Sequence, residues 1–414
     1  MKQLRTKLLI LADDLTGALD SGVQFTTKGD QVYIRVDHEN ALEDTDKADV
    51  LVVNTETRHI PSDEAYRIIY ELVREAIDAG ITGIYKKTDS GLRGNVGAEL
   101  TAVLDAAQAD RLAFIPAWPA MGRTTKDGIH YVNGERLAES IFAKDVIDPV
   151  KDSLITDLIH RQTDAEVTLH GSSSEEKGIV VYDCTDDRQL AELAKEICST
   201  HDKILLAAGC AGLLEKFPRQ SEGKTADAPE TGLDKDLLVL SGSMNDITRK
   251  QLENAERNGS LRVHVPMEKI VSDSWSNAEI QKFARTFLQE ADTPVAVIDT
   301  MAPFVKPDIR HEELAAKIAC AMGRTARCLL EEGSARTFMI IGGDTLLGFI
   351  RELGITALRP ICEIAPGIVL AGYTHNGKNH CLITKSGAFG TEDQLTEIQQ
   401  KLQEDRYDIG KVQH

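Results

Sequence analysis

The sequence has few cysteines, and none of them stands in a metal-binding or redox motif. The seven cysteines are scattered along 414 residues, and no pair of them has CxxC spacing. An odd, scattered set in a chain of this length is typical of reduced, separately buried thiols rather than of disulfides or a zinc site. Long apolar runs are also lacking: the stretch 8–12 is too short for a signal-peptide core or a membrane span, and no later stretch is long enough. We therefore expect a soluble, cytoplasmic protein.

Positive charge is scarce as well. The chain has 47 lysines and arginines against 66 aspartates and glutamates, which gives a formal net charge of −19. Nucleic acid and anionic membrane surfaces repel such a protein, so neither is an expected partner. A small anionic ligand is still allowed, because the local field of a pocket can oppose the overall charge. The length and a hydrophobic content of 42% predict two or three globular domains.

Several common catalytic and nucleotide-binding motifs are missing. The sequence has no GxxxxGK[ST], no GxGxxG after a predicted strand, no HExxH and no GxSxG. These absences argue against a P-loop enzyme, the usual dinucleotide-binding fold, a zinc protease and a hydrolase with a nucleophile elbow. Any nucleotide must be held in a less common way.

Strand-like and helix-like segments alternate along the chain, which predicts mostly parallel sheets with helices on both faces. In the first half we predict strands at 7–11, 31–36, 49–53, 81–85 and 112–115, and helices at 16–28, 61–79 and 98–107. In the second half we predict strands at 237–240, 295–298 and 338–341, several short strands within 361–384, and helices at 312–332, 346–353 and 392–403.

A polar stretch with no apolar periodicity, Ser221 to Asp234, divides these two halves and is typical of a linker. We therefore predict two domains, residues 1–225 and residues 235–414. The expected fold class is α/β, with each domain a mostly parallel or mixed sheet flanked by helices, and without a P-loop.

The segment KKTDSGLRGNVG, residues 86–97, is the most informative part of the chain. It follows a predicted strand and precedes a predicted helix. Glycines let backbone N–H groups approach an anion, and a helix N-terminus favours negative charge. Arg93 can donate two hydrogen bonds to a carboxylate or phosphate. The segment therefore predicts a site for a small, oxygen-rich anion; a turn with solvated charges is the alternative.

Two adjacent aspartates, Asp13 and Asp14, follow the first predicted strand. Ligands of open α/β sheets lie beyond the carboxyl ends of strands, where a carboxylate can accept a hydroxyl proton or hold Mg²⁺. An aspartate at this place can also cap the next helix. We expect one of the pair to cap and the other to function. Arg58, after the third strand, is either a carboxylate clamp or a surface arginine.

The segment 116–134 reads as a long irregular connection, and such segments in compact domains are usually functional or disordered. Its aromatic residues favour order. Arg123, His130 and Asn133 are candidates to line a pocket or a domain interface. For His130 a hydrogen-bonded structural role is favoured over catalysis.

Three glycine-bearing, hydroxyl-rich loops follow strands in the second half. They are Ser241-Gly242-Ser243, Gly342-Gly343-Asp344-Thr345 and the segment 385–390. Glycine-rich turns at helix N-termini can cradle anions, so three of them in one domain predict a polyphosphate site. Three unrelated turns are the alternative.

Six segments, in order, resemble the four-carbon acid sugar kinase family over almost the whole chain. They are ADDLTGALDSGVQ, KKTDSGLRGNVGAEL, PAWPAMGRTTKDGIHYVNG, LSGS, GGDT, and PG with TKSGAFG. Members of that family use ATP to phosphorylate threonate, erythronate or their 3-oxo forms at the terminal hydroxyl. The resemblance implies a sugar-acid-binding N-terminal domain and a nucleotide-binding C-terminal domain. The GVQ after Asp20-Ser21 is more similar to threonate and erythronate kinases than to 3-oxo-tetronate kinases.

The resemblance also implies roles for matching residues. Sugar-acid contacts are implied for Asp13 or Asp14, Arg58, Lys87, and the loop Asp89, Ser90, Gly91, Leu92 and Arg93. ATP contacts are implied for Ser243 or Ser241, Gly342, Gly343, Asp344, Thr345 and Gly387. Many members have threonine where this chain has Gly91.

Phosphoryl transfer requires positioning, Mg²⁺ and a carboxylate near the attacking hydroxyl. We predict that the two domains close over a cleft, with Asp14 or Asp13 as the base and Asp89 as the next candidate. Lys86 or Lys87 either neutralises developing charge or is solvated. The chain would bind a sugar acid and ATP. Its oligomeric state cannot be read from the sequence, and a homodimer would be unsurprising. The alternative functions are a sugar-acid dehydratase or aldolase without nucleotide, and a two-domain solute-binding or sensor protein.

Overall fold

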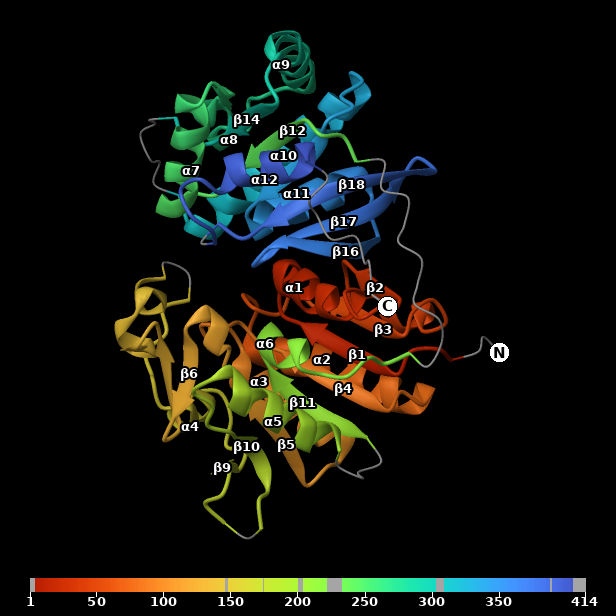
Figure 1. Ribbon diagram of the computed structural model, residues 1–414, viewed down its shortest axis with the longest axis vertical. Coiled ribbons are helices and arrows are strands. Elements are labelled where there is room, and N and C mark those ends of the chain that lie inside the picture. The colour runs from red at the N-terminus through yellow and green to blue at the C-terminus, as the bar shows by residue number, and fades with distance from the viewer. Residues whose placement is uncertain are drawn as a thin grey trace. The chain divides into compact units, whose positions relative to one another are not determined.

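The computed structural model describes residues 4–145, 148–173, 175–199, 204–221, 233–302, 309–387 and 389–404. Most of the predicted linker, residues 222–232, lies outside these ranges. The chain forms two compact units, Met1–Ala226 and Asp227–His414, called unit 1 and unit 2 below. Figure 1 shows unit 1 from red to yellow-green and unit 2 from green to blue.

The sheet of unit 1 is parallel throughout. Its strand order is β2 (Val32–Arg35), β3 (Val50–Asn54), β1 (Leu8–Ala12), β4 (Gly83–Lys87), β11 (Leu205–Gly209), β5 (Arg111–Ile115), β10 (Gly178–Val181) and β9 (Val167–Leu169). β1, β3 and β4 are fully buried, as the uninterrupted apolar run of β1 indicates for a strand covered on both faces. All five strands predicted in this half are confirmed, with boundaries shifted by one or two residues.

Helices cover both faces of this sheet. α2 (Ser62–Ala79) and α3 (Val96–Ala107) pack with alternate strand residues in one large apolar cluster, joined by α4 (Ile155–His160). α1 (Leu15–Thr26), α5 (Asp187–Cys198) and α6 (Ala211–Glu215) contribute nothing to that cluster, and α6 packs against both α1 and α5. We place α1, α5 and α6 on the opposite face of the sheet. β1 and β4 are neighbours, and the helices that follow them, α1 and α3, therefore lie on different faces.

The segment 116–134 is not irregular, so that prediction is wrong. Its second half forms, with the two residues that follow it, an antiparallel meander of β6 (Arg123–Lys126), β7 (Ile129–Val132) and β8 (Glu135–Arg136). Two-residue turns, Asp127-Gly128 and Asn133-Gly134, join the strands, and all four turn residues have positive φ. Asp-Gly and Asn-Gly are the preferred residues of such hairpin turns, because both central positions need left-handed backbone.

The sheet of unit 2 is mixed. Its order is β13 (Leu261–His264), β14 (Val295–Asp299), β12 (Leu237–Ser241), β15 (Thr337–Ile341), β18 (Lys378–Lys385), β17 (Ile368–His375) and β16 (Ala357–Ala365). The first five are parallel, and β18, β17 and β16 form an antiparallel meander. The strands predicted within 361–384 are therefore present, but they are long, with eight or nine residues each.

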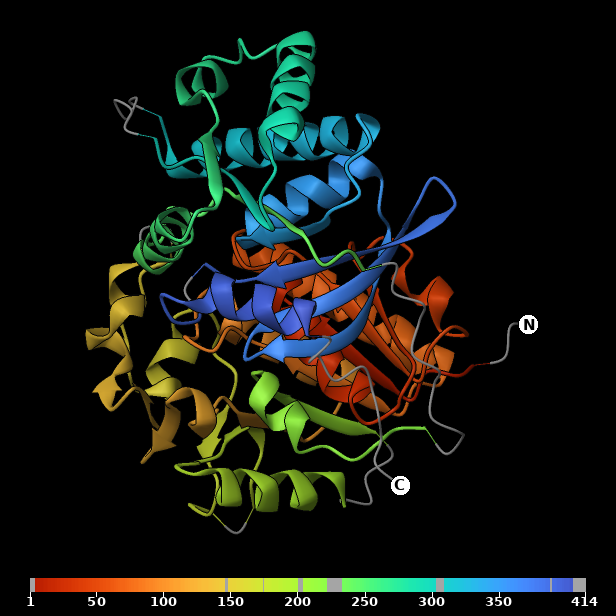
Figure 2. The same cartoon turned by 45° about the horizontal axis from the view of Figure 1, so that its top comes forward.

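The helices of unit 2 also divide between two faces (Figure 2). α7 (Asp246–Arg257) and α12 (Gln394–Gln403) pack on one face, in a cluster with alternate residues of β12, β15 and β18. α10 (His311–Glu331) packs against α11 (Gly343–Leu353), and the ring of Phe349 in α11 contacts Phe338, which lies outside that cluster. The remaining helices are α8 (Met267–Val271) and α9 (Asn277–Glu290). Among the described helices, none is both long and apolar enough to cross a membrane.

Candidate functional site

In unit 1 the predicted site residues follow neighbouring strands at one edge of the sheet. Asp13 and Asp14 follow β1, Arg58 comes shortly after β3, and Asp89 comes shortly after β4. The helix after β1 and the helix after β4 lie on opposite faces, so the order of the chain reverses between the carboxyl ends of these two strands. This topological switch point is where open α/β sheets bind ligands.

The two aspartates have different surroundings. Asp14 is the N-cap of α1: its Oδ1 accepts from the N–H of Gly17 at 2.8 Å, and its Oδ2 accepts from Thr16 Oγ1 at 2.6 Å. Asp13 is 2% exposed, and within the described part of the chain its Oδ1 has no hydrogen-bond partner. One aspartate therefore caps the helix, as expected, while the other keeps a buried carboxylate oxygen unused.

The guanidinium of Arg58 forms ion pairs with three aspartates. Its Nε donates to Asp13 Oδ2 at 2.7 Å, its Nη1 donates to Asp14 Oδ2 at 2.8 Å, and its Nη2 lies 3.7 Å from Asp89 Oδ1. The guanidinium is largely buried, so the interpretation of Arg58 as a surface arginine is wrong. Despite the cost of burial, these three carboxylates raise the pKa of Arg58 further, and Arg58 in turn lowers the pKa of Asp14.

The loop after β4 is organised around Asp89. Its carboxylate accepts two hydrogen bonds from the Arg93 guanidinium, at 2.7 and 3.0 Å, and others from the backbone N–H groups of Gly91 and Arg93. Arg93 also donates to Asp145 at 2.8 Å. Burial opposes ionisation, but Arg93 and Arg58 hold the pKa of Asp89 far below its usual range. Asp89 is therefore a poor proton acceptor, and Arg93 is already bound to carboxylates.

Neither lysine at the end of β4 is solvated, so that alternative is wrong for both. Consecutive strand residues point to opposite faces. Lys86 is fully buried on the face of α3, where its Nζ lies 3.0 Å from Glu99 Oε2. Lys87 points toward the start of α1, and its Nζ donates to the carbonyl of Thr88 at 2.7 Å. A side chain at Gly17 would collide with this ammonium, so the glycine lets the helix approach it.

Three further residues complete the site, and two of them were missed or undervalued from the sequence. The ring of Phe142 lies against Gly91, with the guanidinium carbons of Arg93 and Arg123 at 5.1 and 5.5 Å from its centre. Arg123 is 8% exposed; it donates to the carbonyl of Met121, and no described carboxylate pairs with it. His130 is buried between Thr125 and the carbonyl of Ser90, and burial lowers its pKa to about 4. His130 is thus a neutral, structural histidine.

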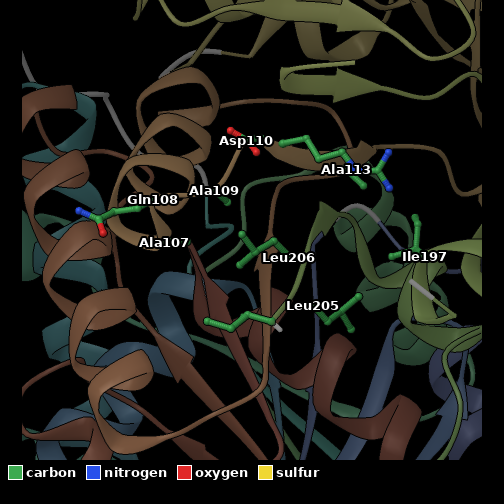
Figure 3. A pocket seen from close by; sticks show the side chains of 10 residues that line it. Ala107, Gln108, Ala109, Asp110, Ala113, Ile197, Leu205 and Leu206 are labelled. Carbon is green, nitrogen blue, oxygen red and sulfur yellow. The ribbon is translucent and has the colours of Figure 1, made fainter. Parts of the chain in front are cut away.

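The described residues of unit 1 line at least two cavities. One of about 260 Å³ borders the Asp89 loop, and its lining residues are Leu92, Arg93, Gly94, Asp148, Pro149, Val150, Lys151, Asp152, Leu158, Arg161 and Gln162. The other, of about 510 Å³, is shown in Figure 3 and includes Arg111 and Leu205, the first residues of β5 and β11. It therefore lies at the amino ends of the strands, opposite the candidate site.

Unit 2 has a second switch point. β12 and β15 are neighbours, and the helices that follow them, α7 and α11, pack on opposite faces of the sheet. The three predicted loops follow β12, β15 and the adjacent strand β18. The sheet therefore brings the three loops together at the carboxyl ends of these three strands.

Close backbone contacts join these loops. The N–H of Gly242 donates to Thr345 Oγ1 at 3.1 Å, and the N–H of Gly342 donates to the carbonyl of Lys385 at 2.9 Å. A side chain at Gly387 would overlap Ser243 Oγ, and Gly342 has a φ of 105°. Only glycine can occupy these two positions without a steric clash or backbone strain. Ser241 Oγ is fully buried and has no hydrogen-bond partner within the described residues.

No group of three or more His, Cys, Asp or Glu side chains in the described ranges is arranged to hold a metal ion. A Mg²⁺ ion that enters with a nucleotide needs fewer protein ligands, since it binds phosphate oxygens, waters and one or two carboxylates. Asp344 fits this need: it is exposed in the first turn of α11, and no described side chain pairs with it.

Two family models match the chain. The sugar-binding N-terminal domain matches residues 8–217, and the nucleotide-binding C-terminal domain matches residues 238–395. These matches define a two-domain protein in which a sugar-binding part precedes a nucleotide-binding part. The chain belongs to the four-carbon acid sugar kinase family.

Curated relatives align over nearly their full length. A D-threonate kinase of Salmonella typhimurium is 29% identical over 94% of this chain and 96% of its own. A D-erythronate kinase of Heliobacterium modesticaldum is 28% identical over 94% and 95%, and a 3-oxo-tetronate kinase of Cupriavidus necator is 28% identical over 96% and 98%. Three substrate preferences are thus represented at nearly the same identity.

Solved structures share the fold. A Salmonella typhimurium protein described as a putative tRNA synthase has a TM-score of 0.76 at 22% identity and covers 95% of this chain and 99% of its own. A Haemophilus influenzae protein has a TM-score of 0.69 at 24% identity and covers 95% of this chain and 100% of its own. The predicted α/β fold with two domains is confirmed.

Proposed function

We propose that this protein is a cytoplasmic, ATP-dependent kinase that phosphorylates the terminal C4 hydroxyl of a four-carbon sugar acid. The observation that carries the proposal is the buried Oδ1 of Asp13 at the switch point of unit 1, in the domain whose family binds sugars. This oxygen has no hydrogen-bond partner among the residues that the structure describes. An ionised carboxylate is an acceptor only, so this oxygen requires a donor such as a substrate hydroxyl.

Asp13 is the residue we assign as general base. Both oxygens of Asp14 are occupied by the cap and by Arg58, and Asp89 is held ionised by two arginines. Asp13 alone among the three has an oxygen left for a hydroxyl proton. Its other oxygen accepts from Arg58, which fixes the carboxylate in place.

The substrate carboxylate needs a cation that is not already neutralised. Sequence reasoning offered Arg58 and Arg93, but both are paired with aspartates. We assign the main contact to Arg123, which is unpaired with any described carboxylate, and a shared contact to Arg93, since both lie against Phe142. Arg123 lies in the segment that the Asp-Gly and Asn-Gly turns fold into a sheet.

The nucleotide belongs to unit 2, where the residues proposed to bind it are Ser241, Ser243, Gly342, Gly343, Asp344, Thr345 and Gly387. Mg²⁺, held by the nucleotide phosphates and Asp344, would neutralise charge on the phosphates. The closing of the two domains during turnover stays a prediction.

D-threonate or D-erythronate is the proposed substrate, ahead of a 3-oxo-tetronate. The site presents carboxylates, which accept hydrogen bonds from hydroxyls. A 3-oxo group can only accept, so it would lose such a contact and leave a buried acceptor unpaired. This argument favours the polyhydroxy acids.

A panel of four-carbon acids, assayed for ADP release with Mg-ATP, tests the proposal. We expect ADP release with threonate or erythronate and a phosphorylated acid as the product. Conversion of a sugar acid without ATP would favour the dehydratase or aldolase instead, and binding without turnover would favour a sensor. Preferred turnover of a 3-oxo acid would overturn the substrate assignment alone.

A further inference from the structure

Lys385 is a buried cation that no described carboxylate neutralises. It is the last residue of β18 and is 1% exposed. Its neighbours across the sheet are Ile341 on β15 and Ile368 on β17, both apolar. No carboxylate of the described residues lies within 4 Å of its Nζ. Burial is the one cause that lowers its pKa, to about 7.

The position of Lys385 places its charge at the edge of the three loops. Its Nζ donates to the carbonyl of Ser386 at 2.9 Å, so the ammonium lies beside the loop that contains Gly387. An ammonium has three donors, and this is the single hydrogen bond from Lys385 Nζ to a described residue. The carbonyl of Lys385 accepts from the N–H of Gly342, which ties the lysine to the second loop.

The register of the sheet places Lys385 in a row with Ser241. Ser241 pairs with Ile341, and Ile341 pairs with Lys385, so these side chains lie on the same face of three adjacent strands. Ser241 Oγ also lacks a partner within the described chain. One row at the carboxyl end of the strands thus carries an unneutralised ammonium and an unsatisfied hydroxyl.

The other buried lysines among the described residues have a carboxylate nearby. Lys86 is paired with Glu99, and Lys87 lies beside Asp14 at the start of α1. A buried charge without a counter-charge is costly, and a bound anion would remove that cost. Lysine is also a common point-charge ligand of phosphate.

We propose that the Lys385 ammonium binds the polyphosphate of the nucleotide directly, with Ser241 Oγ as a second phosphate ligand. This assignment rests on the proposed function, because it names how unit 2 recognises the charged part of the nucleotide. The base and ribose are not involved, so the contact discriminates among nucleotides by phosphate content.

The test compares Lys385→Met with Lys378→Met, which makes the same change at the exposed start of the same strand. Calorimetric titration with ATP, ADP and adenosine measures binding to each protein. We expect Lys385→Met to weaken the binding of ATP and ADP by about 10- to 100-fold, which is the effect of losing a charged hydrogen bond. Adenosine affinity and the KM of the sugar acid should not change. Lys385→Arg should restore part of the ATP affinity, and Lys378→Met should match wild type.

A second measurement needs no variant. A phosphate beside Lys385 would favour its protonated form, so ATP binding at pH 8 should take up a proton, approaching about one per nucleotide. Titrations in two buffers of different ionisation enthalpy give that number, and adenosine should give none.

Unchanged ATP affinity in a folded Lys385→Met protein, or ATP binding without proton uptake in wild type, would overturn the role of Lys385 and leave the kinase proposal standing. Failure of wild type to bind any nucleotide would overturn the kinase proposal and this assignment together.

Discussion

The two switch points balance charge in different ways. In unit 1 the carboxylates of Asp13, Asp14, Asp89 and Asp145 are interleaved with Arg58, Arg93 and Lys87, and most of the hydrogen-bonding positions are filled from within. In unit 2 the loops offer backbone N–H groups, hydroxyls and one buried lysine with no described carboxylate near it. The first site is nearly neutral; the second carries an uncompensated positive charge.

This difference matches two kinds of ligand. A small sugar acid carries one negative charge and several hydroxyls, so a site for it needs acceptors for the hydroxyls as much as cations. A triphosphate carries several negative charges and few donors, so its site needs cations and N–H groups. The site of unit 1 is therefore not simply electropositive, although its sequence predicts a site for a small anion.

The largest expected effect comes from Asp13, whose buried Oδ1 accepts no hydrogen bond from a described residue. We expect Asp13→Asn to lower kcat by about 10²- to 10⁴-fold, the usual contribution of a general base. The KM for ATP should stay within a factor of about two, because the loops proposed to bind the nucleotide lie in unit 2. Steady-state kinetics with each substrate varied in turn measure both values.

Asp14→Asn is the matched control. It weakens the cap of α1 and one contact of Arg58, so we expect a stability loss of about 1–2 kcal/mol and a smaller decrease in kcat. A loss of kcat in Asp14→Asn that equals or exceeds the loss in Asp13→Asn would transfer the role of base to Asp14.

The next prediction compares the stability effects of two buried cations, Arg58 from unit 1 and Lys385 from unit 2. Arg58→Met leaves three carboxylates without their shared partner, so we expect a loss of about 3–5 kcal/mol in the free energy of unfolding. Lys385→Met removes a charge that nothing described compensates, so without nucleotide the same quantity should be unchanged or higher. Denaturant unfolding of both variants measures the difference. Equal destabilisation by the two changes would contradict the contrast between the sites.

The pH dependence of Lys385 follows from the same charge. Its folded pKa of about 7 lies below the usual unfolded value of about 10.4, so between these pH values the unfolded chain binds more protons. The stability of wild type relative to Lys385→Met should therefore rise as the pH increases from about 7 to about 10, and stay constant below that range. A flat difference would mean that Lys385 is neutralised by something else.

Much of the fold could be predicted from the sequence, because the central strands are uninterrupted apolar runs and the main helices have clear periodicity. The strands β9 to β11 and β13 and the helices α4 to α9 were missed. β13 is only partly buried and β9 has three half-buried residues, so both have a weak apolar signal. The meander 123–136 was missed although Asp127-Gly128 and Asn133-Gly134 are standard hairpin turns.

The candidate residues were predictable as a set, and their partners were not. Glycines, aspartates and arginines at strand ends indicate a site, but whether Arg58 is free or paired depends on contacts across 44 or 45 residues. Which aspartate caps α1 depends on the backbone angles at Asp14. Asp13 and Asp14 are the same residue type, so the sequence does not distinguish them. Phe142 and Asp145 enter the site from a segment with no motif of its own. Lys385 was visible in TKSGAFG, yet its isolation depends on its apolar neighbours.

The smallest expected effect is that of a substitution at Gly91. Because Gly91 belongs to unit 1, the substitution should affect the sugar-acid site and leave the site of unit 2 unchanged. A side chain there would overlap the ring of Phe142, which lies against both Arg93 and Arg123. Gly91→Thr should therefore cost about 1–3 kcal/mol in stability by overpacking. It should also raise the KM of the sugar acid and leave the KM of ATP unchanged. Adding Phe142→Ala makes room for the threonine, so the double variant should be more stable than the sum of the two single changes predicts. Additive losses would show that Phe142 moves freely and does not set the position of the two arginines.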